Sequence, residues 1–331
     1  VQLPGHVKLR RMSTGTEMPQ VQMLEVARDC AGQRIDNWLM RHLGSVPKSL
    51  IYRVLRRGEV RVNKRRIRPD YRVQCGDLIR IPPIRIAPRG PKMRPPDQAG
   101  QLLLRRTLFE DDDFLVLNKP SGMPVHAGSG LDWGLIDALR LARPELARID
   151  LVHRLDRETS GCLLLAKSAQ ALRASHRGLR DGMVEKRYLT LVRGPWQLGA
   201  HTERSPLRRF VHRGGERMVE VHQDGQAAVS HFEPVTLLRR AALLAVRIDT
   251  GRTHQIRVHA RHLGHPVAGD RRYGDPAFNR DMREFGLHRL FLHAQHLRWN
   301  MGSRSIDVGA PIEPDLASVL TLLEANSAPG R

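Results

Sequence analysis

The sequence predicts an α+β protein built from two domains. From Gln101 onward, short apolar strand-like runs are interspersed with amphipathic helical patterns. They lack the ordered βαβ repetition and the glycine fingerprint of a doubly wound nucleotide fold. Before that point, two helical patterns are followed by short strands and closed by Pro82-Pro83. A chain of 331 residues is long enough for about two such domains.

The first 83 residues divide into a tail and a small domain. Residues 1–31 show no sustained periodicity and predict a partly disordered tail with one short strand at 21–26. Residues 32–83 form the small domain, in which one helical face follows Gln33 and a second ends at Gly58. Alternating Val60 and Val62 then predict a strand, and a turn at Gly76 precedes a last strand near Ile79.

A linker and a large domain complete the predicted order. Residues 84–100 are rich in Pro, Gly and basic side chains, which predicts an interdomain linker. The large domain then covers residues 101–325. Its strand candidates share short apolar or β-branched runs and lie at residues 114–117, 163–166, 187–192, 243–248 and 291–298.

The composition indicates a polyanionic partner. Lys and Arg number 55 against 34 Asp and Glu, which gives a formal net charge of +21 and a pI near 11.2. Of these 55 basic residues, 21 lie in the first 100 positions. Nucleic acid is the first candidate partner and an anionic membrane surface is the second. Aromatic residues make up only 5% of the chain, so wide base-stacking platforms are not expected.

Cysteine content and hydropathy predict a soluble cytoplasmic protein. Cys30, Cys75 and Cys162 are widely separated and match neither a disulfide framework nor a CxxC metal pair. The sequence contains no apolar run long enough to span a membrane and no secretory signal pattern. We therefore expect reduced thiols and no membrane partner.

The segment from His153 to Gly161, with the sequence HRLDRETSG, is the best candidate for a reaction centre. It places Asp156 among arginines on a turn that leads into an apolar run, and loops on a rigid scaffold often carry catalytic groups. By residue type alone, the same segment could be a capped turn whose aspartate accepts local amide hydrogen bonds.

This nine-residue string resembles the signature of the RNA pseudouridine synthases, in the branch typified by the large-subunit ribosomal enzymes. Further blocks resemble motifs of the same family, and they lie at residues 118–122, 185–188, 250–259 and 291–294. The resemblance implies a catalytic domain with a mixed, mainly antiparallel sheet flanked by helices. It assigns the catalytic carboxylate to Asp156, contact with the target base to Tyr188, and pairing with the catalytic acid to Arg257.

The implied reaction fits these residue types. A pseudouridine synthase breaks the C1′–N1 bond of uridine, turns the uracil and rejoins it through C5, so it needs no cofactor and no metal. It does need a charged carboxylate beside the ribose and a pocket that retains the detached base. An arginine next to a partly buried aspartate favours the ionised form, so a pair of Asp156 and Arg257 would keep the acid charged.

Residues 33–83 resemble the S4 RNA-binding module, which implies a basic surface that contacts phosphates. Arg53 and Arg57 lie on the polar face of a helix whose other face is apolar, although a solvated surface would give the same pattern. The candidate RNA-binding residues of this module are Lys48, Arg53, Arg57, Arg61 and Lys64. In the large domain, Arg154 is the candidate for insertion into the RNA stack when the uridine is flipped out, and a structural ion pair is the alternative.

Several alternatives stay open. The histidines at 254, 259, 262 and 265 suggest a metal site, but HExxH is absent and only His259 and His262 would share a helical face. A non-catalytic ribosome-assembly factor with an S4 module is a second alternative.

Within the family, residues 46–55 and 133–135 look most like the C-type enzymes, which modify uridines of 23S ribosomal RNA. A D-type enzyme is the runner-up, and a transfer-RNA enzyme comes third. We expect a monomer that acts on 23S rRNA or on a large-subunit assembly intermediate.

Overall fold

The computed structural model describes residues 20–43, 46–84, 93–127, 132–212, 216–302 and 304–326. Its internal contacts divide the chain into two compact units, Val1–Pro91 and Lys92–Arg331. Parts of the predicted tail and linker, residues 1–19 and 85–92, lie outside the described residues. No described helix is long and apolar enough to cross a bilayer.

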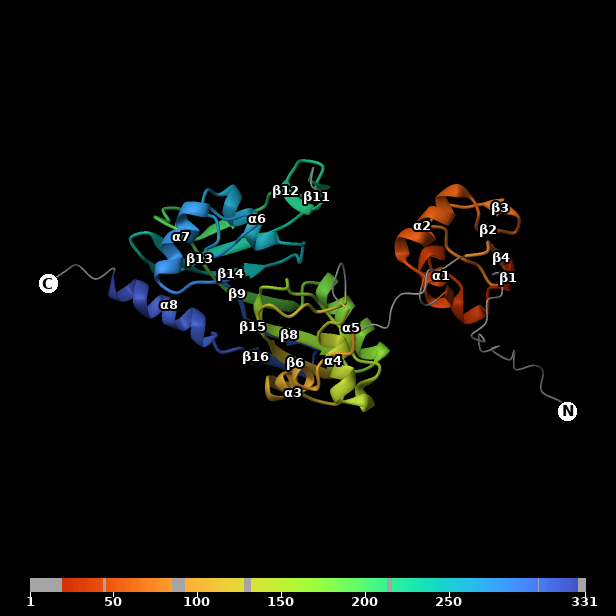
Figure 1. The fold of residues 1–331 in the computed structure, drawn as a ribbon, viewed down its shortest axis with the longest axis horizontal. Helices are drawn as coiled ribbons and strands as arrows, with labels where there is room; N and C mark the ends of the chain where they lie inside the picture. Colours follow the sequence, from red (N-terminus) through yellow and green to blue (C-terminus); the bar gives the residue numbers. More distant parts are fainter. Residues whose placement is uncertain are drawn as a thin grey trace. The chain divides into compact units, whose positions relative to one another are not determined.

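The first unit packs two helices on a four-stranded antiparallel sheet with the order β1-β4-β2-β3 (Figure 1). Its elements in chain order are β1 (Gln22–Glu25), the short 3-10 helix η1 (Arg28–Cys30), α1 (Ile35–Leu43), α2 (Lys48–Arg57), β2 (Arg61–Val62), β3 (Arg65–Arg66) and β4 (Leu78–Ile81). The apolar faces expected for both helices lie in one core, where Ile35, Trp38, Ile51 and Leu55 are almost fully buried. The predicted helices and strands of this unit are therefore confirmed.

Two turns of the first unit have positive φ angles, which account for the residue types found there. Gly58 ends α2 with φ of 70°, a left-handed conformation that glycine adopts without steric cost. Asn63 and Lys64 both have positive φ between β2 and β3, as a two-residue hairpin turn requires. The Asn63 side chain then donates to Asp77 over 2.8 Å and accepts from the Leu78 amide over 2.9 Å, which connects this turn to the predicted turn at Gly76.

Two predicted boundaries differ from the structure. Strand β1 lies inside the predicted tail but pairs with β4 over four residues, so it is an edge strand of the first unit. Helix α3 (Asp97–Arg105) begins inside the predicted linker. It packs against α4 (Leu135–Ala142), and a Cβ at Gly100 would lie 2.5 Å from Ala142 Cβ. Both segments are ordered by partners distant in sequence, which local periodicity does not reveal.

The second unit is built on a ten-stranded sheet with the central order β10-β13-β14-β9-β15-β8-β6-β5. Only β15 and β8 pair in parallel, so the mixed, mainly antiparallel sheet is confirmed. The strands are β5 (Thr107–Glu110), β6 (Phe114–Lys119), β7 (Asp150–Leu151), β8 (Ser160–Ala166), β9 (Val184–Arg193), β10 (His201–Glu203), β13 (Ser230–Leu237), β14 (Ala241–Ile248), β15 (Leu292–Asn300) and β16 (Ser305–Gly309). The remaining elements are η2 (Pro144–Leu146), α5 (Ala169–Arg180), the hairpin β11 (Leu207–Val211) and β12 (Arg217–Val221), α6 (Gln255–His262), α7 (Pro276–Glu284) and α8 (Pro314–Ala325).

The parallel contact between β8 and β15 positions the segment that contains Asp156. Gly161 pairs with Ala294 and has φ of 106°. A Cβ at Gly161 would lie 2.2 Å from the Ala294 carbonyl oxygen, so the two strands approach this closely only with glycine at this position. The segment 152–159 therefore enters the sheet centre at a closely defined point.

Candidate active site

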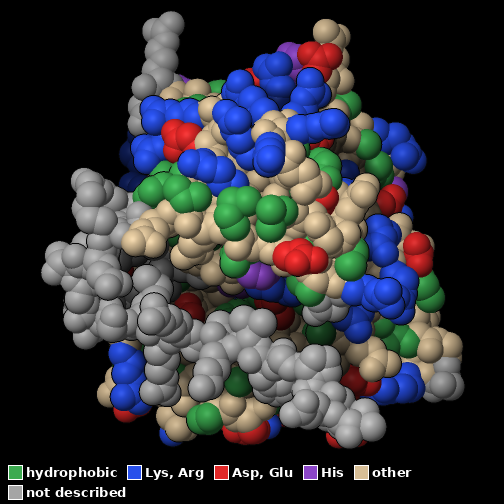
Figure 2. All heavy atoms as spheres, turned by 90° about the vertical axis from the view of Figure 1, so that its right-hand side faces the viewer, with side chains coloured by type: hydrophobic (Ala, Val, Ile, Leu, Met, Phe, Trp, Pro, Cys, Tyr) green, Lys and Arg blue, Asp and Glu red, His purple; other side chains and the backbone are tan. Residues whose placement is uncertain are grey.

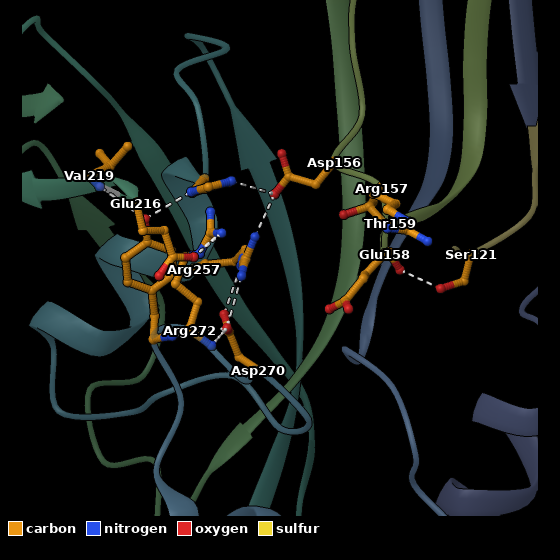
Figure 3. Close-up of polar contacts among 12 residues, drawn as sticks. Ser121, Asp156, Arg157, Glu158, Thr159, Glu216, Val219, Arg257, Asp270 and Arg272 are labelled. Atoms are coloured by element: carbon orange, nitrogen blue, oxygen red, sulfur yellow. Dashed lines mark hydrogen bonds and ion pairs between the residues drawn. The ribbon is translucent and has the colours of Figure 1, made fainter. Parts of the chain in front are cut away.

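A buried lysine holds the loop between β7 and β8. Lys119, at the end of β6, is fully buried, and its Nζ donates to the carbonyl oxygens of Pro120, Arg157 and Thr159 over 2.9, 3.0 and 2.8 Å. Ser121 Oγ donates to the Glu158 carbonyl over 2.7 Å (Figure 3). Burial lowers the pKa of Lys119 to about 7. The block 118–122 therefore braces the loop that carries Asp156.

Arg257 lies between two carboxylates (Figure 3). Its Nη1 donates to Asp156 Oδ2 over 2.9 Å, and its Nε and Nη2 donate to the two oxygens of Asp270 over 2.7 and 2.9 Å. The Asp270 side chain is fully buried, whereas the Asp156 side chain is 21% exposed. Asp270 thus holds the guanidinium through Nε and Nη2, and Nη1 is left to donate to Asp156.

The charges in this group stabilise one another. Burial alone would lower the pKa of Arg257, but its hydrogen bonds and charge pairing with Asp270, and then with Asp156, outweigh burial and raise it. Burial likewise opposes ionisation of Asp270, yet the hydrogen bond and charge of Arg257 hold the pKa of that carboxyl below its usual range. Backbone amides of Arg272 and Tyr273 donate to Asp270 Oδ1 over 2.9 and 3.0 Å. Arg257 and Asp270 therefore stay charged at neutral pH.

Asp156 lies where two cavities meet. The outer cavity has a volume of about 620 Å³ and is lined by basic side chains that include Arg154, Arg271 and Arg272. The inner cavity is smaller, about 60 Å³, and its apolar lining includes Ile248 and Leu292. The residues that line both cavities are Arg154, Leu155, Asp156, His254 and Arg257. The arrangement places a carboxylate between a larger cavity lined by arginines and a smaller one of mixed polar and apolar lining.

Tyr188 lies in the wall of the inner cavity. It belongs to β9, pairs with Val246 of β14 and is only 6% exposed. Burial, and then the charge of Asp156, raise the pKa of its hydroxyl, so the ring stays neutral at physiological pH. A neutral aromatic ring beside the carboxylate can pack against a planar base.

The structure places the histidines in other roles than metal binding. His153 Nε2 accepts a hydrogen bond from the Leu164 amide over 3.1 Å, and burial lowers its pKa to about 3. His259 is fully buried between Ser230 Oγ and the Ser205 carbonyl, at 3.0 and 2.9 Å. His265 lies 2.8 Å from the Arg193 carbonyl. Within the described ranges, no three His, Cys, Asp or Glu side chains gather as a metal site.

The predicted RNA-binding residues occupy two places. Arg154 is exposed and lines both cavities beside Asp156. The predicted contacts of the first unit are all exposed, on α2, on β2 and in the turn after β2, and they are Lys48, Arg53, Arg57, Arg61 and Lys64. Figure 2 shows groups of Lys and Arg side chains, with fewer Asp and Glu among them, on the face that it draws.

Sequence reasoning missed Asp270 and Tyr273. Their segment, Asp270-Arg271-Arg272-Tyr273, has no helical or strand periodicity. Its only signal is one acid directly before two arginines, which a surface ion pair would also explain. Asp270 contacts Arg257 from 13 positions away because the chain turns back after α6.

Asp156 thus lies between a larger cavity lined by arginines and a smaller, partly apolar one, an arrangement suited to an enzyme that acts on a polyanionic substrate. A profile described as RNA pseudouridylate synthase matches residues 113–262, and an S4 domain profile matches residues 33–79. The "Ribosomal large subunit pseudouridine synthase C" of Pasteurella multocida (strain Pm70) is 47% identical to this chain. The match covers 92% of this chain and 94% of the length of that protein. The protein of the same name from Escherichia coli (strain K12) is 50% identical over 86% of this chain and 90% of its own.

Solved structures agree with this assignment. Human RNA Pseudouridylate Synthase Domain Containing 1 is 26% identical, with a TM-score of 0.54 over 67% of this chain and 94% of that chain. Human RNA Pseudouridylate Synthase Domain Containing 4 shares the fold, at 23% identity and a TM-score of 0.58 over 69% of this chain and 96% of that chain. The chain belongs to the RNA pseudouridine synthase family and carries an S4 domain at its N-terminal side. This membership excludes the non-catalytic alternative.

Proposed function

We propose that this enzyme converts specific uridines of 23S ribosomal RNA to pseudouridine, with Asp156 as the catalytic carboxylate. The observation that carries the proposal is the ion pair of Asp156 with Arg257 at the junction of the two cavities. The names of the relatives, at 47 to 50% identity, support large-subunit rRNA as the substrate. In this proposal the enzyme acts as a monomer on the rRNA or on a large-subunit assembly intermediate.

Asp156, Arg257 and Tyr188 have different roles in the proposed reaction. The C1′–N1 bond breaks with its electrons on uracil, the ring turns, C5 bonds to C1′, and the C5 proton is lost while N1 gains one. Arg257 holds Asp156 through Oδ2, so Oδ1 is the oxygen offered to the nucleoside. The ring of Tyr188 packs against uracil in the inner cavity and limits its escape. The isomerisation adds no atoms and changes no redox state, so it needs no cofactor.

The basic groups supply RNA binding in two steps. The exposed arginines and lysines of the S4 domain contact phosphates without reading sequence. Arg154, which is exposed and lines both cavities, fills the gap in the stack after the uridine has been flipped out at a cost of a few kcal/mol. Protein domains joined on one chain raise each other's effective concentration at the RNA.

The test uses a 23S rRNA transcript tritiated at uridine C5. Wild-type protein should release tritium as C5 loses its proton, and Asp156→Asn should release none while it binds the RNA with unchanged affinity. Full activity of Asp156→Asn would overturn the role of this carboxylate. Tritium release from a transfer-RNA transcript, with none from 23S rRNA, would overturn the proposal that 23S rRNA is the substrate.

A further inference from the structure

His254 lies at the catalytic carboxylate, and neither the sequence motif nor the reaction scheme above assigns it a role. It precedes α6 in a left-handed backbone conformation with φ of 55°, which is uncommon for a residue with a Cβ. This conformation directs the imidazole to the junction of the two cavities, both of which it lines. Its Nε2 is 3.8 Å from Asp156 Oδ2, and the side chain is 13% exposed.

A hydrogen-bond chain favours one tautomer of the His254 imidazole. The Val219 amide donates to Tyr273 Oη over 3.0 Å, so this oxygen already accepts one hydrogen bond. Tyr273 Oη lies 2.8 Å from His254 Nδ1. When the tyrosine hydroxyl donates to Nδ1, both its oxygen and its proton have partners, and Nδ1 is satisfied as an acceptor. A neutral His254 therefore carries its proton on Nε2, the nitrogen that faces the cavities.

The surroundings keep this imidazole neutral. The charged groups that face it are Asp156 from the β7–β8 loop, Arg257 from α6, and Asp270 and Arg272 from the segment before α7. Burial dominates and lowers the pKa of His254 to about 4. A cationic imidazole would form an ion pair with Asp156 and weaken its reactivity, whereas a neutral one does not.

The Nε2–H group of His254 does not form a hydrogen bond with Asp156. A separation of 3.8 Å exceeds hydrogen-bonding distance, and Oδ2 already accepts from Arg257 Nη1 at 2.9 Å. His254 lines both cavities, so this donor is available to a nucleoside bound beside Asp156. The carbonyl oxygens of uracil are the acceptors that this nucleoside brings, and they gain negative charge when the C1′–N1 bond breaks.

We propose that His254 is a catalytic residue whose neutral Nε2–H donates a hydrogen bond to a uracil carbonyl oxygen and stabilises the detached base. Tyr273 is the positioning residue that holds the imidazole in this tautomer. The inference rests on the proposed reaction at Asp156. A preorganised donor aimed at developing charge contributes about 10²- to 10³-fold to a rate constant in other enzymes.

The test measures single-turnover tritium release from the 23S transcript with enzyme in excess, which separates the rate constant at saturation from the apparent Kd. His254→Ala should lower the rate constant about 100-fold or more and leave the Kd within about twofold. His254→Gln, whose amide N–H reaches about as far as Nε2, should recover at least about tenfold. The rate constant of Tyr273→Phe should lie between those of wild type and His254→Ala, because both tautomers of the His254 imidazole become available.

The controls make each outcome decisive. His262→Ala, an exposed histidine on the same helix, should match wild type. A wild-type rate for His254→Ala, or a change in Kd alone, would overturn the proposal. Equal loss in His254→Gln and His254→Ala, with unchanged thermal unfolding, would also overturn it. Asp156→Asn is run in parallel, and its activity would refute the proposed reaction rather than the role of His254.

Discussion

Arg257 Nη1 donates to Asp156 Oδ2 over 2.9 Å, and this pair joins α6 to the β7–β8 loop across 101 positions of sequence. The pair is 7% exposed on the arginine side and 21% exposed on the aspartate side. A charge pair at this depth is strong because water screens it little, and each partner is costly to leave alone. The geometry of the loop that carries Asp156 thus depends on the fold of a distant helix.

Substitution Arg257→Lys should remove most of the activity although it keeps the positive charge. One ammonium cannot replace the three directed hydrogen bonds that Arg257 makes to Asp156 and Asp270. We expect a loss of at least about 100-fold in the single-turnover rate constant. The exposed Arg261→Lys on the same helix is the control, and similar rates for the two variants would contradict the prediction.

Substitution Asp270→Asn should destabilise the protein and lower its activity. The neutral amide leaves the buried Arg257 with one carboxylate instead of two, and breaking a buried pair costs about 3–5 kcal/mol. Urea unfolding would measure the free energy of unfolding, and tritium release would measure the activity. Asp281→Asn, at an exposed ion pair with Arg240, should change neither measurement. Equal stability of the two variants would argue against a structural role for Asp270.

Substitution Lys119→Met should loosen the β7–β8 loop and slow the reaction while RNA binding persists. It removes the donor for three carbonyl oxygens, and each buried acceptor left without a partner costs about 1–3 kcal/mol. Hydrogen exchange of the amides in residues 152–160 should become faster. Lys167→Met, at a partly exposed ion pair with Glu110, is the control. Unchanged exchange and unchanged activity would refute the bracing role.

Stability should fall as the pH is lowered through the range below about 6.5. Burial lowers the pKa of His153 to about 3 and of His254 to about 4. Between these values and the ordinary value near 6.5, the unfolded chain binds more protons than the native one, so stability rises with pH. Each histidine contributes a slope of at most about 1.4 kcal/mol per pH unit in that window.

Urea unfolding at a series of pH values from 4.5 to 8 would measure this slope. The variant His153→Gln should show a shallower slope than wild type, since one of the contributing groups no longer titrates. A wild-type slope in His153→Gln would exclude the neutral buried histidine as its source.

Neutralising the exposed face of the S4 domain should weaken RNA binding without changing the chemistry. Each phosphate contact contributes about 0.7 to 0.9 to the slope of log K against log salt. The triple substitution of Arg53, Arg57 and Lys64 by Gln should therefore lower that slope by about 2 to 3 and leave the saturated rate constant unchanged. Arg304→Gln, which removes an arginine paired with Asp111 and Asp113, should leave the slope near the wild-type value. An unaltered slope in the triple variant would show that this face does not contact RNA.

The candidate site shows how far sequence reasoning reaches. The ungapped motif around Asp156 identified the loop because its residue pattern is local. Arg257 and Tyr188 were located only through separate motifs, and the structure brings both to the cavities at Asp156. Asp270, Tyr273 and the role of Lys119 as a brace depend on contacts between distant segments, and local periodicity carries no information on those contacts.

The sequence by itself determined the α+β class, the helices and strands with strong periodicity, the basic character and the family, because all of these depend on local patterns or ungapped motifs. Only the tertiary structure decided that β1 joins the first sheet, that α3 packs on α4, and that Arg257 is shared by two acids. It also decided which nitrogen of His254 faces the cavity. The physical reason is that burial and hydrogen-bond partners are properties of the packed chain, and they set the charge and direction of each side chain.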